Sequence, residues 1–184
     1  MRPSAVHPTG VERTFGEEEI IVTKTDLKGI ILYANDVFLR VSALTETDAL
    51  GSPHSIIRHP EMPRCVSSLL WDTIESGQEI FAYVLDMAVD GAHYWVFAHV
   101  TPTMGPDGSI VGYHSNRRTP DRHVLAGVQQ LYATLLAEEQ RQGSTKTAIE
   151  AGRALLAQVL ADRGSTYEEF VWELANSAKA GASR

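Results

Sequence analysis

The change in apolar spacing after Gly77 constrains the fold of this chain more than any other feature of its sequence. From residue 79 to residue 118, β-branched and aromatic residues alternate with small or polar ones, which is typical of strands whose two faces meet different surroundings. Turn residues interrupt this segment at Asp90-Gly91 and at Pro106-Asp107-Gly108. The segment therefore predicts three consecutive antiparallel strands.

A second β-rich segment, from Ile20 to Tyr33, has a turn at residues 26–29 and predicts a hairpin. Between the two β-rich parts, apolar residues recur at helical spacing over residues 35–44 and again over residues 64–77. Two strands, several short helices and three strands define an α+β domain with a five-stranded antiparallel sheet and helices on one face. We expect this domain to span residues 19–119.

Two further segments flank the predicted domain. Residues 1–18 contain proline and glycine and end in an acidic run, so we expect a loose arm or a short capping helix. Residues 120–184 carry apolar stripes typical of about three helices, and a capping-box pattern from Ser165 to Glu168 marks the start of the third. Trp172 lies off the stripe of that helix, so either packing on a neighbouring helix or contact with a partner explains it.

Composition excludes several classes of protein. The 184 residues, 43% hydrophobic and 21% charged, suffice for a core, and a net charge of -7 argues against a nucleic-acid-binding protein. Cys65 is the only cysteine, so the chain forms no intramolecular disulfide and no cysteine zinc site, which indicates a reducing compartment. No run approaches about 18 apolar residues, and the start lacks the apolar part of a signal peptide. We therefore expect a cytoplasmic protein without membrane insertion.

The predicted strand from Phe81 to Val89 has one face of large apolar residues and one of small residues with a single acid, Asp86. A three-residue turn at Asp90-Gly91 aligns Asp86 with Tyr94 and continues the face of small residues onto the next strand. A two-residue turn would put large aromatic residues there instead. We prefer the first register because it leaves room under the helices for a flat ligand, although tight packing without a cavity is the alternative.

The two faces of this strand have different requirements. The large apolar face has to be covered by the N-terminal arm, the C-terminal helices or another subunit. Asp86 on the inner face needs a partner such as Arg58 or a ligand donor, because an unpaired buried carboxylate is costly.

The stretch RHPEMP, from Arg58 to Pro63, holds two prolines and an oppositely charged pair, so it fits neither a helix nor a strand. With the preceding PHSII, with Trp71 and with the later DGAHYWVFAHVTP and GSIVGYHSNRR, it closely resembles PAS sensor domains of the bacterial aerotaxis-receptor type. That family typically has Pro-His, a short apolar stretch and then Arg-His-Pro-Asp-Met-Pro. The resemblance covers about residues 20–118.

The resemblance implies a PAS fold and a sensor of redox or oxygen status that holds FAD non-covalently between sheet and helices. By position, the family's flavin contacts fall on six residues, and His54 of the Pro-His element completes our candidate set: Asn35, His54, Arg58, His59, Glu61, Trp71 and Asp86. The residue types suit this role, since arginine offers a donor fork to a diphosphate, tryptophan stacks on or walls a ring, and asparagine both donates and accepts. The prolines would preorganise the loop.

The chain departs from the family at Ser67, where a phenylalanine is usual, at Leu69, where an acid is usual, and at Asp86, where an asparagine is usual. A basic pair is also replaced by Met87 and Ala88. An acid at position 86 either repels a flavin that gains negative charge or, when protonated, donates a hydrogen bond to it. A cofactor-free PAS interaction module and a haem-binding sensor therefore remain alternatives.

The histidines and serines carry little chemistry of their own. Among the histidines, only His54 and His59 are spaced in a way that suggests ligands to a metal or a haem iron. No third ligand lies nearby in the sequence. Nothing resembles a nucleophile with its base, so we expect a flavoprotein that is not an enzyme.

Output is expected to occur by protein contact. The sequence contains no recognisable kinase or methyl-accepting signalling domain. By analogy with the family, we expect a signal-transduction partner such as a membrane-bound chemoreceptor in aerotaxis or chemotaxis, and a homodimer. Deleting residues 120–184 is then expected to abolish partner binding and to spare the cofactor.

Overall fold

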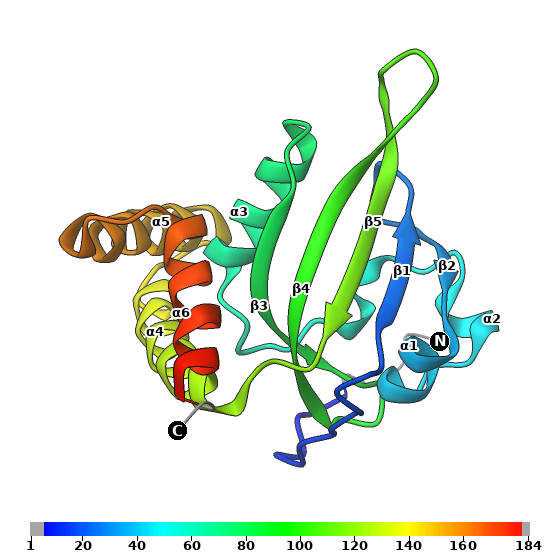
Figure 1. Ribbon diagram of the computed structural model, residues 1–184, viewed down its shortest axis with the longest axis horizontal. Coiled ribbons are helices and arrows are strands. Elements are labelled where there is room, and N and C mark those ends of the chain that lie inside the picture. The colour runs from blue at the N-terminus through cyan, green and yellow to red at the C-terminus, as the bar shows by residue number, and fades with distance from the viewer. Residues whose placement is uncertain (1–5, 182–184) are drawn as a thin grey trace.

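A five-stranded antiparallel sheet forms the centre of the molecule, in a computed structural model that describes residues 6–181 and the side chains of residues 6–176 (Figure 1). Its spatial order is β2 (Ile31–Ala34), β1 (Ile21–Thr25), β5 (Ile110–Arg118), β4 (His93–Met104) and β3 (Ile80–Met87). All neighbouring pairs are antiparallel. The structure thus confirms the predicted α+β class and the five strands.

Short helices connect β2 to β3 and cover the inner face of the sheet: α1 (Asp36–Ser42), α2 (Glu46–Ala49), the 3-10 helix η1 (His54–Ile57) and α3 (Arg64–Glu75). Local sequence explains where the first two begin. Asn35 caps α1 by accepting a hydrogen bond from the backbone N–H of Phe38, and Thr45 caps α2 through the N–H of Asp48.

The turn between β3 and β4 has the predicted register. Asp86 lies opposite Tyr94 and Val84 lies opposite Val96. In the turn, the N–H of Ala88 donates to the carbonyl of Ala92 and the N–H of Gly91 donates to the carbonyl of Ala88, and Gly91 has a φ of 90° that favours glycine. The small residues of both strands therefore share the inner face.

Of the three C-terminal helices, α4 (Arg122–Gln140) and α6 (Tyr167–Gly181) pack against the large apolar face at β3 and β4, and α5 (Thr145–Arg163) packs on α3 and α4 (Figure 1). The hydroxyl of Tyr132 on α4 donates to the carbonyl of Tyr83 at 2.5 Å. The ring of Trp172 lies 4.7 Å from that of Phe81. The helices, one of the three predicted covers, are confirmed on this face, and Trp172 packs on Phe81 and Phe97 of the sheet.

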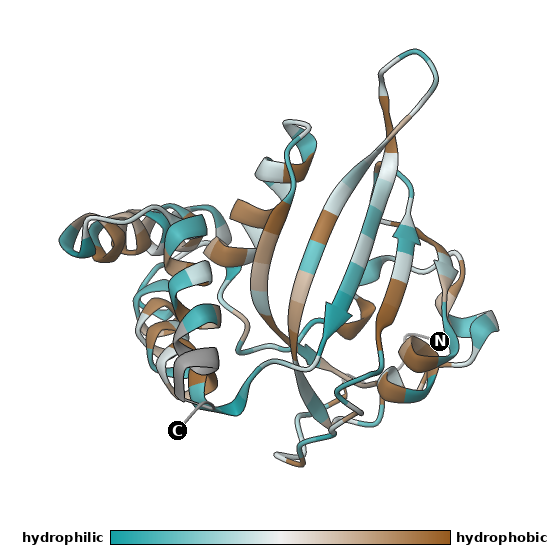
Figure 2. Cartoon of the chain, viewed as in Figure 1, coloured by the Kyte–Doolittle hydropathy of each residue, from teal (hydrophilic) through white to brown (hydrophobic). Residues whose placement is uncertain are grey.

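Hydropathy reflects this arrangement (Figure 2). Hydrophobic residues are concentrated in β3 and in the helices beside it, whereas β5 is largely hydrophilic. β3 is an edge strand, and the helices beside it also protect that edge from pairing with other chains.

Two sequence-based expectations about the flanking segments were wrong in detail. The described part of the N-terminal arm is neither loose nor helical, because residues 9–13 run alongside the β3–β4 turn and the start of β4, with the N–H of Arg13 bonded to the carbonyl of His93. The box at the start of α6 joins Thr166 and Glu169, one residue later than predicted. Residues 1–5 and 182–184 of the predicted flanking segments lie outside the described residues.

Within residues 6–181, no helix is both long enough and apolar enough to cross a membrane.

Candidate functional site

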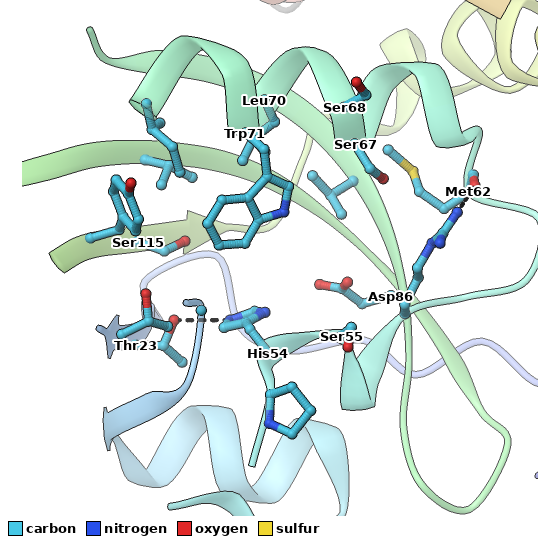
Figure 3. Close-up of a pocket in the computed structure, with 18 of the residues that line it drawn as sticks. Thr23, His54, Ser55, Met62, Ser67, Ser68, Leu70, Trp71, Asp86 and Ser115 are labelled. Carbon is cyan, nitrogen blue, oxygen red and sulfur yellow. Dashed lines mark hydrogen bonds between the residues drawn. The ribbon is translucent and has the colours of Figure 1, made fainter. Parts of the chain in front are cut away.

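A cavity of about 470 Å³ lies between the inner face of the sheet and the helices, where the sequence predicted room for a ligand (Figure 3). This volume falls within the range of small-molecule sites. Four of the seven candidate residues line it: His54, Arg58, Trp71 and Asp86. The remaining lining includes residues of β1, β5, α3 and α5 that the sequence reasoning did not select, among them Thr23, Thr25, Ser67, Ser115, Arg117 and Ile149.

Helix α3 forms one wall of the cavity. Ser67, Leu70, Trp71 and Ile74 recur at helical spacing along its inner face, and Trp71 points into the cavity (Figure 3). The indole packs against Gly29, where an added Cβ would lie 2.8 Å from the ring, and stands edge-on to Tyr113 at 5.5 Å. These contacts fix the indole as a flat wall.

The partner of Asp86 is Arg117 and not Arg58, which corrects the sequence-based expectation. One guanidinium nitrogen of Arg117 donates to a carboxylate oxygen of Asp86 at 2.7 Å, and its Nε donates to Ser115 at 3.0 Å. Both charged side chains are buried. Arg117 lies opposite the small residue Ala98, which leaves space for the guanidinium on the inner face.

His54 belongs to the same buried cluster. Its Nε2 lies 3.1 Å from Arg117 Nη2 and 3.1 Å from the hydroxyl of Thr23. Because a guanidinium only donates, this contact requires Nε2 to be unprotonated and to accept. Burial, followed by the charge of Arg117, lowers the pKa of His54 well below its usual value, so the ring is neutral.

Asp86 has the opposite shift. Its burial raises the pKa of the carboxyl to about 6, against the effect of the Arg117 charge, which lowers it. The carboxyl therefore exchanges a proton close to neutral pH, and protonation weakens its pairing with Arg117.

Arg58 has unused hydrogen-bonding capacity. Its backbone forms an isolated bridge with Asp86, and one guanidinium nitrogen approaches the carbonyl of Met62 at 3.4 Å. The Nε is buried and has no partner among the described residues, and the same holds for the hydroxyl of Thr25. Burial and the nearby charge of Arg64 both lower the pKa of Arg58. A ligand or an ordered water in the cavity completes the hydrogen bonding of such donors.

The structure does not bring the other three candidates to the cavity. The side-chain amide of Asn35 is engaged with the backbone of Ile20, Val22 and Phe38, so it fixes the start of α1. His59 is buried outside the cavity lining and accepts a hydrogen bond from the N–H of Glu61, and Glu61 itself is exposed.

The structure does not bring His54 and His59 together as a pair of iron ligands. The Nε2 lone pair of His54 accepts from Arg117, and His59 lies outside the cavity lining. Among the described residues, no three His, Cys, Asp or Glu side chains are grouped so as to hold a metal ion.

The comparisons with known proteins agree with the observed fold. A family model described as "PAS fold" matches residues 20–115, more than half of the chain. The chain therefore belongs to the PAS family.

Among its relatives, the chain is 35% identical over 133 residues to the Aerotaxis receptor of Escherichia coli (strain K12), which covers 71% of this chain and 26% of the receptor. It is 26% identical over 113 residues to the Nitrogen fixation regulatory protein of Klebsiella pneumoniae, covering 61% of this chain and 23% of that protein. The chain thus spans about a quarter of the length of these relatives.

A solved structure, the dark state of the blue-light photoreceptor Aureochrome1 LOV, superposes with a TM-score of 0.51. It is 25% identical, with 66% of this chain and 84% of that chain covered. The comparisons therefore identify a PAS domain related to a sensory receptor.

Proposed function

We propose that the cavity binds FAD and that the protein is a redox sensor that signals by contact with another protein. The observation that carries this proposal is the cavity itself, with a flat indole wall from Trp71 and a buried guanidinium of Arg58 that lacks a partner for its Nε. The resemblance of the surrounding motif to the aerotaxis-receptor type supports FAD as the ligand.

The residues present fit a flavin. Trp71 together with Val84 and Val100 offers flat apolar surfaces for a ring system. Four cationic side chains line the same cavity, Lys28, Arg58, Arg64 and Arg117, and the last of these is paired with Asp86. Burial, followed by the charge of Arg64, lowers the pKa of Arg58, and a bound diphosphate would offset both effects by accepting from the guanidinium.

FAD, when bound, supplies a ring that accepts and releases electrons. The chain's own contribution is the group of Asp86, Arg117 and His54, which holds a proton on the Asp86 carboxyl with a pKa of about 6. A negative charge arriving nearby favours protonation of Asp86, and this releases one donor of Arg117. The replacement of the family's asparagine by Asp86 thus couples proton binding to the charge of the ligand.

The partner and the assembly belong to the same proposal. The relative named an aerotaxis receptor supports a role in aerotaxis or chemotaxis, with a cytoplasmic homodimer that contacts a chemoreceptor-type signalling protein. Because this chain spans only about a quarter of that relative, the partner has to be identified directly, for example by cross-linking of purified protein to a candidate receptor.

The visible absorption spectrum of freshly purified protein tests the proposal, followed by release of the chromophore and its identification by mass. Flavin bands and released FAD are the expected result. An intense haem band would contradict it. Protein that is colourless and also takes up no added FAD would contradict it too, and would leave the cofactor-free interaction module as the function.

A further inference from the structure

The N-terminus of α3 lacks a cap of its own. Its N-cap residue is Pro63, which makes no side-chain hydrogen bond to the helix. The cap comes instead from α4, where the two carboxylate oxygens of Glu139 accept from the backbone N–H of Arg64 at 2.9 Å and of Cys65 at 2.7 Å. Glu139 is buried, and a carboxylate at this end of a helix is stabilised by the helix dipole. This contact joins residues 75 positions apart.

Helix α5 packs against the junction that Glu139 forms with the start of α3. At Gly152 an added Cβ would lie 2.8 Å from Glu139 Oε1 and 2.9 Å from Cys65 Sγ, so only glycine permits this approach. One residue further along, Arg153 donates to Ser68 at 3.2 Å and pairs with the carboxylate of Asp72. The α5 helix is thus fixed to the outer side of α3.

The same face of α5 reaches the cavity. Ile149 lies three residues before Gly152 and lines the cavity, so the C-terminal helices contribute part of its wall. Helix α3 is therefore held between the cavity, which Trp71 faces, and the junction with α4 and α5. Pro63, at the start of α3, also ends the loop that carries Arg58. A shift of α3 at its contact with Glu139 would therefore move Trp71 and Arg58, the two residues that face the proposed ligand.

We infer that Glu139 and Gly152 are positioning residues of the ligand site, and that Ile149 makes α5 part of that site. This inference rests on the proposed flavin binding for its ligand. Coupling of this kind is reciprocal, so the ligand stabilises the junction as much as the junction stabilises the ligand. Deletion of residues 120–184 is accordingly no longer expected to spare the cofactor.

Titration with FAD of the full chain and of matched variants measures the effect. We expect Glu139→Ala to bind FAD about tenfold more weakly, the size of a lost helix cap, and Glu139→Gln to retain part of the affinity because one acceptor remains. Glu138→Ala is the control, since the neighbouring carboxylate pairs with Arg141 and Gln142. Equal affinity for the wild type and Glu139→Ala would overturn the inference.

A second matched pair addresses the close approach of the helices. Gly152→Ala is expected to weaken FAD binding by about the same factor, because the new methyl group forces α5 away from α3. Gly127→Ala, on α4, is the control because an added Cβ there meets nothing within 4 Å. If both alanine variants bind FAD like the wild type, Gly152 has no positioning role.

A measurement without ligand keeps the two proposals apart. In a chain carrying Trp95→Phe and Trp172→Phe, Trp71 is the only tryptophan, and its quenching by acrylamide reports on the position of α3. Glu139→Ala is expected to increase this quenching, with partial rescue by Glu139→Gln and no change in Glu138→Ala. No change in Glu139→Ala would overturn the inference whether or not FAD binds. Failure of the wild type to bind FAD would contradict only the proposed function.

Discussion

The two faces of the β3–β4 hairpin are built from alternate residues of the same strands, yet they are packed in opposite ways. The outer face presents large side chains such as Tyr83 and Trp95, which are buried against α4 and α6 in one apolar cluster. The inner face presents small residues, the ion pair of Asp86 and Arg117, and a cavity of about 470 Å³.

This difference separates stability from function within one hairpin. Close packing of apolar side chains stabilises a protein, whereas a cavity and a buried charge pair contribute little or cost free energy. The unsatisfied donor of Arg58 on this face supports the proposed ligand site. Substitutions on the outer face should therefore change stability, and substitutions on the inner face should change ligand binding and pH dependence.

The largest effect is expected for Trp95→Ala on the outer face. Trp95 is buried and its ring lies 5.9 Å from that of Tyr132. Removing a buried tryptophan side chain costs about 3–5 kcal/mol of unfolding free energy. Denaturant unfolding measures this loss, and the folded fraction should still bind FAD with wild-type affinity.

Leu32→Ala is the control for this substitution. Leu32 is an exposed apolar residue on the edge strand β2, so its removal should cost less than about 0.5 kcal/mol. A similar loss for both variants would mean that the C-terminal helices do not form a closely packed cover.

The next effect concerns the pH dependence of stability. Asp86 has a pKa of about 6 in the folded protein, raised from 3.8, so its contribution is fully present below pH 3.8 and is lost as the pH rises through about 6. The unfolding free energy of the wild type minus that of Asp86→Asn should therefore fall by about 2 kcal/mol between pH 4 and pH 7. Urea unfolding at a series of pH values measures the difference.

Titration of His54 changes the unfolding free energy in the opposite direction. For this reason the unfolding free energy of Asp86→Asn is subtracted from that of the wild type. The lowered pKa of His54 contributes stability above about pH 6.5 that is lost as the pH falls, in both the wild type and Asp86→Asn. The two curves then differ only through Asp86. Parallel curves across the range would show that Asp86 stays ionised and is fully compensated by Arg117.

Substitution of Arg58 addresses the ligand alone. Arg58→Leu should weaken FAD binding about tenfold, which is about 1.4 kcal/mol, because it removes the unsatisfied guanidinium. The unfolding free energy should change by less than about 1 kcal/mol, since the protein itself uses only one long hydrogen bond from this side chain. Arg122→Leu is the control, because that arginine pairs with Glu12 outside the cavity lining. Unchanged FAD affinity in Arg58→Leu would remove the main support for the proposed site.

The sequence predicted the sheet and the register of β3 and β4 because both follow from local patterns. Alternating apolar residues define the strands, and Gly91 fixes the turn that aligns Asp86 with Tyr94. The local sequence also predicts the cap at Asn35, because asparagine before a helix is a common N-cap. The family resemblance implied a ligand contact for this residue instead.

The partners of Asp86 and of α3 depend on contacts between distant segments. Arg117 lies 31 residues from Asp86, on a strand that is not its neighbour in the sheet, so the full strand order has to be known before the pair is visible. Glu139 and Cys65 are 74 residues apart and meet only because the C-terminal helices fold back on α3. Periodicity within one helix carries no information about such contacts.

The smallest effect is expected at the rim of the outer face, for Trp172→Ala. Trp172 is 38% exposed and packs on Phe81 and Phe97, so its loss should cost about 1 kcal/mol, well below the cost of a fully buried tryptophan. FAD affinity should not change, because this side chain lies outside the cavity lining. Urea unfolding and sedimentation of the same variant distinguish two roles of Trp172, covering the sheet and contacting a second copy of the chain. A drop in stability without a change in mass means that Trp172 only covers the sheet, whereas a change from dimer to monomer at unchanged stability means that it contacts a second copy.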